Sequence, residues 1–162
     1  MERDYGKATV WLKKAATLGL VPSQYSLGKM YGYGLGIEKN PKEAFVWIAK
    51  AGESGFAKAQ YNLGKMYRDG FGTKKDLNAA ARWFLAAARQ GHHGAQHHIA
   101  VRLVRGEGIA KDLVQALTWF ELAARGGNAS AAIERRTLAR SLSPEQRAEA
   151  QRLADAWKPQ TK

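Results

Sequence analysis

The chain has 162 residues, a formal net charge of +12 at pH 7 and no cysteine. This length suffices for a domain with its own hydrophobic core, and the lack of cysteine excludes disulfides, thiolate metal sites and thiol nucleophiles. The excess of positive charge, which is spread along the chain, favours an acidic partner.

The start of the chain is charged, and no apolar run reaches the ~18 residues that a membrane span needs. The sequence therefore predicts neither a signal peptide nor a membrane span, which indicates a cytoplasmic protein for the chain as it stands. If the chain is a fragment of a longer protein, with further repeats before Met1, a periplasmic or secreted location stays open.

A repeat of 36 residues runs through the sequence. Trp11, Trp47, Trp83 and Trp119 are each separated by this interval. An alanine three residues before each tryptophan, an alanine four residues after it and a glycine eight residues after it recur in step. A period of this length is typical of proteins built from stacked helical modules.

Within one period the apolar spacing is helical twice, so each period predicts a helical hairpin. One set lies at i, i+3, i+4 and i+7 and consists of Ala44, Trp47, Ile48 and Ala51. The other set lies at i, i+4, i+7 and i+8 and consists of Ala59, Leu63, Met66 and Tyr67. The first of these helices is predicted to begin at an Asn40 cap with Pro41 as its first residue, and the second to end at Gly70.

The predicted elements form one helical-repeat domain over residues 1–162. In chain order they are a helix over 4–20, two-helix repeats over 21–56, 57–92 and 93–128, a decayed terminal repeat helix over 129–142 and a capping helix over 143–158. The last begins with Ser143-Pro144-Glu145-Gln146, the pattern of a capping box. Because neither helix of a hairpin buries its apolar stripe alone, the hairpins are expected to stack.

Glycine recurs inside the predicted helices at Gly28 and Gly64. A glycine there costs ~1 kcal/mol relative to alanine. Its recurrence predicts close backbone contact with a neighbouring helix, at the row of alanines that includes Ala44 and Ala80.

The run Leu63-Gly64-x-x-Tyr67, followed by Ala80 and Phe84, resembles the tetratricopeptide pattern with a longer Gly-x-Gly loop between the helices. This variant is similar to the Sel-one-like repeats (SLR) over about residues 4 to 141. The resemblance implies an all-α, right-handed α-solenoid of antiparallel helical hairpins. It places the Leu-Gly helices on a concave face and the tryptophan helices outside, so the chain opens with the outer helix of an incomplete repeat.

The resemblance also implies a non-catalytic scaffold or adaptor that holds a partner protein or peptide in its concave groove. By spacing, the groove residues lie next to each Leu-Gly pair or its equivalent. They are Tyr25, Lys29, Tyr33, Tyr61, Asn62, Lys65, Arg68, His97, His98, Val101 and Arg105. Because these residues are mainly aromatic and basic, we expect the partner segment to be acidic.

Two other kinds of association stay open. The charge and the tyrosine-rich groove also fit nonspecific RNA or DNA binding, although Ser26, Asn62 and His98, which occupy equivalent positions, show no consistent base-reading code. The second kind is self-association through the unpaired first helix, by way of Val10, Leu12 and Leu18.

The four histidines lie within residues 92–98, the one cluster that suggests a metal. His93 and His97 are four apart, a spacing that paired metal ligands use on a helix. No carboxylate lies between Asp76 and Glu107 to complete a coordination shell. We therefore expect no metal and no cofactor, with His92 as a structural residue and His97 as a groove-facing ring; a pH-sensitive groove stays open as an alternative.

Catalysis has little support in the sequence. The serines at helix starts or turns are expected to cap helices, and none lies in a Gly-x-Ser-x-Gly motif. The acidic residues are scattered, and the Gly-x-Gly elements recur with the repeat but lack the rest of a nucleotide motif. We therefore predict that the protein is not an enzyme.

Overall fold

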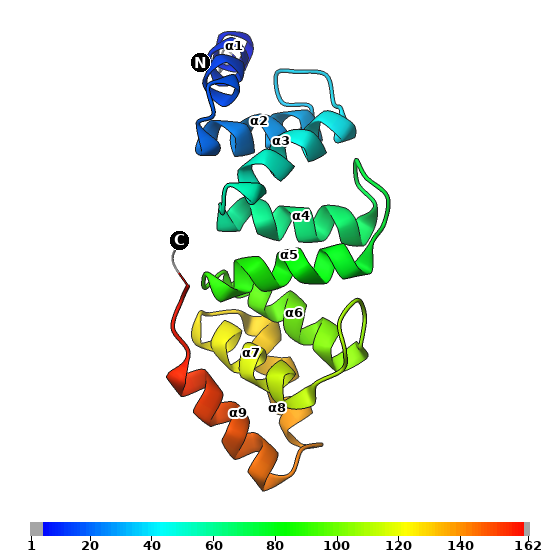
Figure 1. Cartoon of the computed structure of the whole chain (residues 1–162), viewed down its shortest axis with the longest axis vertical. Helices are drawn as coiled ribbons and strands as arrows, with labels where there is room; N and C mark the ends of the chain where they lie inside the picture. Colours follow the sequence, from blue (N-terminus) through cyan, green and yellow to red (C-terminus); the bar gives the residue numbers. More distant parts are fainter. Residues whose placement is uncertain (1–4, 161–162) are drawn as a thin grey trace. The chain divides into compact units, whose positions relative to one another are not determined.

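The computed structural model describes residues 5–160, and within that range the chain forms nine α-helices and no strand (Figure 1). The prediction of an all-α fold built from helical hairpins is confirmed. The chain divides after residue 76 into two compact units. Each unit has its own core of packed helices.

Unit 1 contains four helices. They are α1 (Tyr5–Thr17), α2 (Val21–Tyr33), α3 (Pro41–Glu53) and α4 (Ala57–Asp69). Consecutive helices pack against each other, and Leu27, Ile48 and Leu63 are buried between them. Residue 4, where the first helix was predicted to begin, lies outside the described residues.

Unit 2 contains five helices. They are α5 (Leu77–Arg89), α6 (His93–Arg105), α7 (Leu113–Arg125), α8 (Ala129–Ala139) and α9 (Pro144–Ala156). Helix α7 is central, because it packs against α6, α8 and α9. The core of unit 2 includes the buried side chains of Phe84, Ile99 and Phe120.

The predicted helix boundaries follow from local chemistry. The Asn40 side chain accepts hydrogen bonds from the backbone N–H groups of Lys42 and Glu43, both at 3.1 Å, and Pro41 is the first residue of α3. Gly70 ends α4 in the left-handed conformation with φ of 70°. These predicted boundaries are confirmed.

The capping box predicted for the last helix is also present. The Ser143 hydroxyl accepts from the Gln146 N–H at 3.2 Å, and the Gln146 side chain accepts from the Ser143 N–H at 3.0 Å. Beyond α9, Trp157 packs edge-on against Trp119 with ring centroids 6.3 Å apart. Trp119 is consequently only 8% exposed, whereas its repeat equivalent Trp11 is 69% exposed.

A buried glutamine on each of α2, α4 and α6 ties that helix to the one before it. Gln24, Gln60 and Gln96 each donate a side-chain hydrogen bond to a backbone carbonyl eight residues earlier, at 3.3, 3.1 and 3.3 Å. The acceptors are the carbonyls of Ala16, Gly52 and Ala88. Each of these carbonyls also accepts the backbone N–H of the glycine three residues further on, so the glutamine is a second donor, and the arrangement recurs with the repeat.

The close approach predicted at Gly28 is present, but its partner is different. A Cβ added at Gly28 would lie 2.7 Å from Cγ1 of Ile48. The alanine row is met one turn later, where a Cβ on Gly32 would lie 3.6 Å from that of Ala44. The large Ile48 side chain therefore occupies the space that glycine opens, and the prediction of an alanine contact at Gly28 is wrong.

Candidate functional site

In unit 1 a pocket lies between α2 and α4, with part of α3 as its floor. Four of the predicted groove residues line it: Lys29, Tyr33, Asn62 and Lys65. The other lining residues are Gly28, Gly32, Ala44, Ile48, Met66, Asp69 and Phe71. We call this the α2/α4 pocket.

Aromatic rings and an amide hold the polar groups of the α2/α4 pocket in place. The Asn62 amide donates a hydrogen bond to the Tyr25 hydroxyl at 3.0 Å. The Lys29 ammonium lies 5.8 Å from the ring centroid of Tyr25 and 5.9 Å from that of Tyr33. These distances are in the range of cation–π attraction, so Lys29 is held between two tyrosines.

Lys65 and Tyr61 form a similar pair one repeat further on. The Lys65 ammonium lies 5.6 Å from the Tyr61 ring centroid. Burial raises the pKa of the Tyr61 hydroxyl, and nearby Arg68 partly offsets this effect. The phenol is therefore neutral at physiological pH and presents a hydrogen-bonding hydroxyl.

Arg68 contributes differently from the prediction. Its guanidinium makes a two-fold contact with the neighbouring Asp69 carboxylate, at 2.6 and 2.7 Å. This hydrogen bonding raises the pKa of Arg68 further. The pair is close to neutral as a unit, and it is Asp69 that lines the α2/α4 pocket.

Unit 2 contains a pocket at the equivalent place between α6 and α8, which we call the α6/α8 pocket. The predicted groove residues Val101 and Arg105 line it. The other lining residues are Val104, Phe120, Glu134, Thr137, Leu138 and Ser141. Every one of these eight residues stands two periods of 36 after a residue that lines the α2/α4 pocket.

The two remaining predicted groove residues, His97 and His98, line neither the α2/α4 pocket nor the α6/α8 pocket. His97 Nε2 is 3.3 Å from a carboxylate oxygen of Glu134, which lines that pocket. The His98 ring stacks on Phe84 with centroids 4.8 Å apart and an interplanar angle of 21°. Each ring therefore already has a neighbour in the fold.

The other two histidines have local partners. His92 caps α6, because its Nδ1 accepts a hydrogen bond from the Ala95 N–H at 3.2 Å. His93 Nδ1 lies 3.1 Å from the Gln96 side-chain oxygen. Among residues 5–160, no three histidine, aspartate or glutamate side chains gather in a metal-binding group.

Glu134 is the main residue of the inner face that the sequence analysis missed. The sequence predicts a decayed terminal repeat helix over 129–142 without groove residues. A signal was present, since Glu134 lies one period after His98 and two after Asn62, both of which were predicted. Extending the period through the terminal repeat would have found it.

The first helix and the residue that follows it carry exposed apolar side chains. Val10 is 68% exposed and Leu18 is 75% exposed, whereas Leu12 is half-buried. Self-association through this surface stays a prediction. Within residues 5–160, no helix has the length and apolar character to cross a membrane.

The chain consists of two-helix modules that repeat every 36 residues, with recurrent buried positions and variable pocket positions. These features define an all-α helical-repeat protein of the α-solenoid class. The family model described as Sel1 repeat matches residues 1–20, 21–56, 57–92 and 93–128. The chain therefore belongs to the Sel1 repeat family. Proteins of this family are generally scaffolds for protein–protein interaction and typically non-catalytic.

Solved structures give the same assignment. A Sel1 repeat protein from Oxalobacter formigenes is 38% identical, with a TM-score of 0.74, over 79% of this chain and 96% of that one. The protective antigen c5321 of uropathogenic Escherichia coli, which displays an SLR fold, is 29% identical, with a TM-score of 0.68, over 93% of this chain and 40% of that one.

A third similar structure is the Helicobacter pylori cysteine rich protein B. It is 28% identical, with a TM-score of 0.58, over 76% of this chain and 94% of that one. A search of curated proteins gave no match. All three similar structures come from bacteria, which fits a bacterial origin for this chain.

Proposed function

We propose that this protein is a non-catalytic scaffold that binds an acidic segment of a protein partner through the α2/α4 pocket. One observation carries the proposal: Lys29, Tyr33, Asn62 and Lys65, from two helices one repeat apart, line the same pocket. Together they offer two positive charges, an aromatic surface and an amide. This is the chemistry that recognises a carboxylate side chain on an extended backbone.

The lysines are partly ordered before a partner arrives. Because Lys29 lies between two tyrosine rings and Lys65 beside a third, the cost of immobilising these flexible side chains on binding is reduced. The Asn62 amide is fixed by Tyr25 and keeps an oxygen that can accept from a partner N–H group. The proposed role of the tyrosines is thus both contact area and positioning.

Asp69 limits where an acidic group binds. Its carboxylate lines the α2/α4 pocket, although Arg68 balances much of its charge. A partner carboxylate is therefore expected near Lys29 and Lys65, with uncharged or basic residues of the partner beside Asp69. Binding should weaken as salt screens the lysines.

The test is selection of random peptides on the immobilised protein, followed by affinity measurement on variants. Lys29→Glu/Lys65→Glu should abolish the enrichment of acidic peptides and weaken binding by about 100-fold or more, given ~1.5–3 kcal/mol for each of the two charged hydrogen bonds. Lys42→Glu/Lys58→Glu is the matched control. It changes the net charge equally at two exposed residues that do not line the pocket.

Equal losses in both double variants would mean that net charge alone drives binding, and the proposal would fail. The same comparison separates the alternative of RNA or DNA association. In that case nuclease treatment removes the captured material, affinity for nucleic acid falls steeply with salt, and both double variants bind it equally poorly.

A further inference from the structure

A second kind of pocket in unit 2 lies between α7, α8 and α9 and is rich in arginine, and we call it the arginine pocket. Arg135 and Arg136 of α8, Arg147 of α9 and Glu121 of α7 line it. The remaining lining residues are Leu117, Ala139, Ala150 and Gln151. Three guanidinium groups against one carboxylate give this lining a formal charge of +2.

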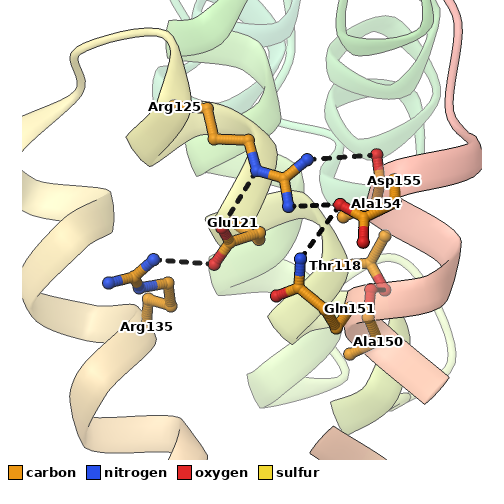
Figure 2. A network of polar contacts seen from close by, with 8 residues as sticks. All are labelled: Thr118, Glu121, Arg125, Arg135, Ala150, Gln151, Ala154 and Asp155. Atoms are coloured by element: carbon orange, nitrogen blue, oxygen red, sulfur yellow. Dashed lines mark hydrogen bonds and ion pairs between the residues drawn. The ribbon is translucent and has the colours of Figure 1, made fainter. Parts of the chain in front are cut away.

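Both oxygens of the carboxylate in the arginine pocket already accept a hydrogen bond from an arginine. One oxygen of Glu121 accepts from Arg125 Nε at 3.0 Å, and the other accepts from Arg135 Nη1 at 2.8 Å. Figure 2 shows the two arginines reaching Glu121 from opposite sides. Arg125 is itself fixed by Asp155, at 2.7 Å, and by the Ala154 carbonyl. Glu121 therefore orients Arg135 and does not stand as an unbalanced negative charge.

The arginines keep hydrogen-bond donors for a ligand. A guanidinium has five N–H donors, and Arg135 uses one of them on Glu121. Arg147 makes a long contact of 3.4 Å to the Ala139 carbonyl. Arg136 is exposed and forms no ion pair with any residue that the structure describes. Donors from two helices thus surround one open space.

We propose that the arginine pocket binds a phosphate monoester, either as a free small molecule or on a side chain of a partner protein. Its charge of +2 matches a phosphate that is close to dianionic at pH 7, and a single carboxylate would leave an uncompensated positive charge. Arginine forks fit phosphate oxygens with paired hydrogen bonds. The arginine pocket shares no residue with the α2/α4 pocket and does not depend on the function proposed for that pocket.

The test is isothermal titration calorimetry of the full chain with three probes. They are inorganic phosphate, a short phosphoserine peptide and the same peptide with unmodified serine, all at equal ionic strength set with chloride. We expect inorganic phosphate and the phosphoserine peptide to bind, and the serine peptide not to bind. Tighter binding of the peptide than of inorganic phosphate identifies a protein-borne phosphate, and the reverse identifies a free one.

Variants localise the binding. Arg136→Gln should weaken phosphate binding by about tenfold, because it removes one charge-assisted contact. Arg140→Gln is the matched control: it removes an exposed arginine four residues away that does not line the pocket. Thermal unfolding of both variants establishes that the fold is intact, which is expected because neither residue is buried.

Two results would overturn the proposal. One is equal weakening by Arg136→Gln and Arg140→Gln, which would indicate diffuse attraction to a basic surface. The other is that inorganic phosphate and the phosphoserine peptide give no more heat than the serine peptide.

Discussion

The α2/α4 pocket of unit 1 and the α6/α8 pocket of unit 2 occupy the same positions in the repeat but differ in chemistry. Lys29 and Lys65 of the first correspond to Val101 and Thr137 of the second. Asn62 corresponds to Glu134. The unit 1 pocket therefore has a basic, hydrogen-bonding lining, whereas the unit 2 pocket is largely apolar, with a carboxylate and an arginine.

The frame around the two pockets is the same. Gly72 in unit 1 and Gly108 in unit 2 have positive φ, and a Cβ on either would overlap a backbone carbonyl at the start of an earlier helix. The buried glutamines repeat in both units as well. The comparison shows that the packing positions set the backbone, while the positions facing the pocket are free to vary. Binding specificity should therefore be read from the pocket positions.

The largest expected effect is the loss of stability when the loop glycines common to both units are replaced. Gly72→Ala and Gly108→Ala should each lower the free energy of unfolding by about 3 kcal/mol or more, because strain at positive φ adds to a clash with the carbonyl of Pro41 or Leu77. Urea denaturation measures the loss. Gly70→Ala is the control: it has a similar φ but no contact under 3.5 Å, so only about 1 kcal/mol is expected.

Overpacking the alanine row should also affect both units. Ala80→Leu in unit 2 and Ala44→Leu in unit 1 replace residues that are fully or almost fully buried. Each should destabilise its unit by about 1–3 kcal/mol. A melting scan that shows no loss for either variant would contradict the packing assigned to this row.

Sensitivity to acid should distinguish the units. Burial opposes ionisation of Glu121, but hydrogen bonds from Arg135 and Arg125 outweigh it and lower the pKa of the carboxyl. Ionised Glu121 therefore contributes to the free energy of unfolding above the ordinary glutamate pKa of about 4.3. This contribution is lost as the pH falls through the lower pKa of the folded state. The equivalent position in unit 1 is Ala49, so this effect belongs to unit 2.

Glu121→Gln measures that contribution. At pH 7 the variant should be less stable by about 1.5–3 kcal/mol, since two hydrogen bonds to a charged group are weakened. In urea denaturation at pH 3 the difference between variant and parent should shrink. A constant difference at both pH values would show that ionisation of Glu121 is not the cause.

The smallest expected effect is transfer of the lysine pair. Val101→Lys/Thr137→Lys places lysines in the α6/α8 pocket at the positions that Lys29 and Lys65 hold in unit 1. When these substitutions are added to the Lys29→Glu/Lys65→Glu variant, its affinity for a selected acidic peptide should rise by about tenfold. Glu134 limits the gain. Fluorescence anisotropy at low salt measures the affinity. No gain in affinity would mean that the lysines bind the peptide only when tyrosines lie beside them.

The helix boundaries and the repeated hairpins could be predicted from the sequence because they depend on neighbouring residues or on the 36-residue period. The Asn40 cap involves residues two and three positions on, and the glycine at the end of α4 is required by the backbone itself. The spacing next to each Leu-Gly pair also selected candidate groove residues, whose role in binding stays a prediction. Lys29, Tyr33, Asn62 and Lys65 were all obtained in this way.

The partners of individual side chains were not predictable by the same rules. Arg68 pairs with Asp69, although neighbouring side chains on a helix do not normally face each other. Ile48, and not an alanine, fills the space at Gly28, because side-chain size decides that contact. The arginine pocket was missed for a similar reason, since it forms only when α9 packs against α7.

The most direct test of the central claim is site-specific photo-cross-linking in living cells. A photoreactive phenylalanine analogue replaces Tyr33, an exposed residue of the α2/α4 pocket, or Val46, an exposed residue of α3 outside it. We predict a discrete cross-linked protein at position 33 that disappears with Lys29→Glu/Lys65→Glu and is absent at position 46. Cross-links at position 46 alone, or equally at both positions, would contradict the assignment of this pocket as the partner site.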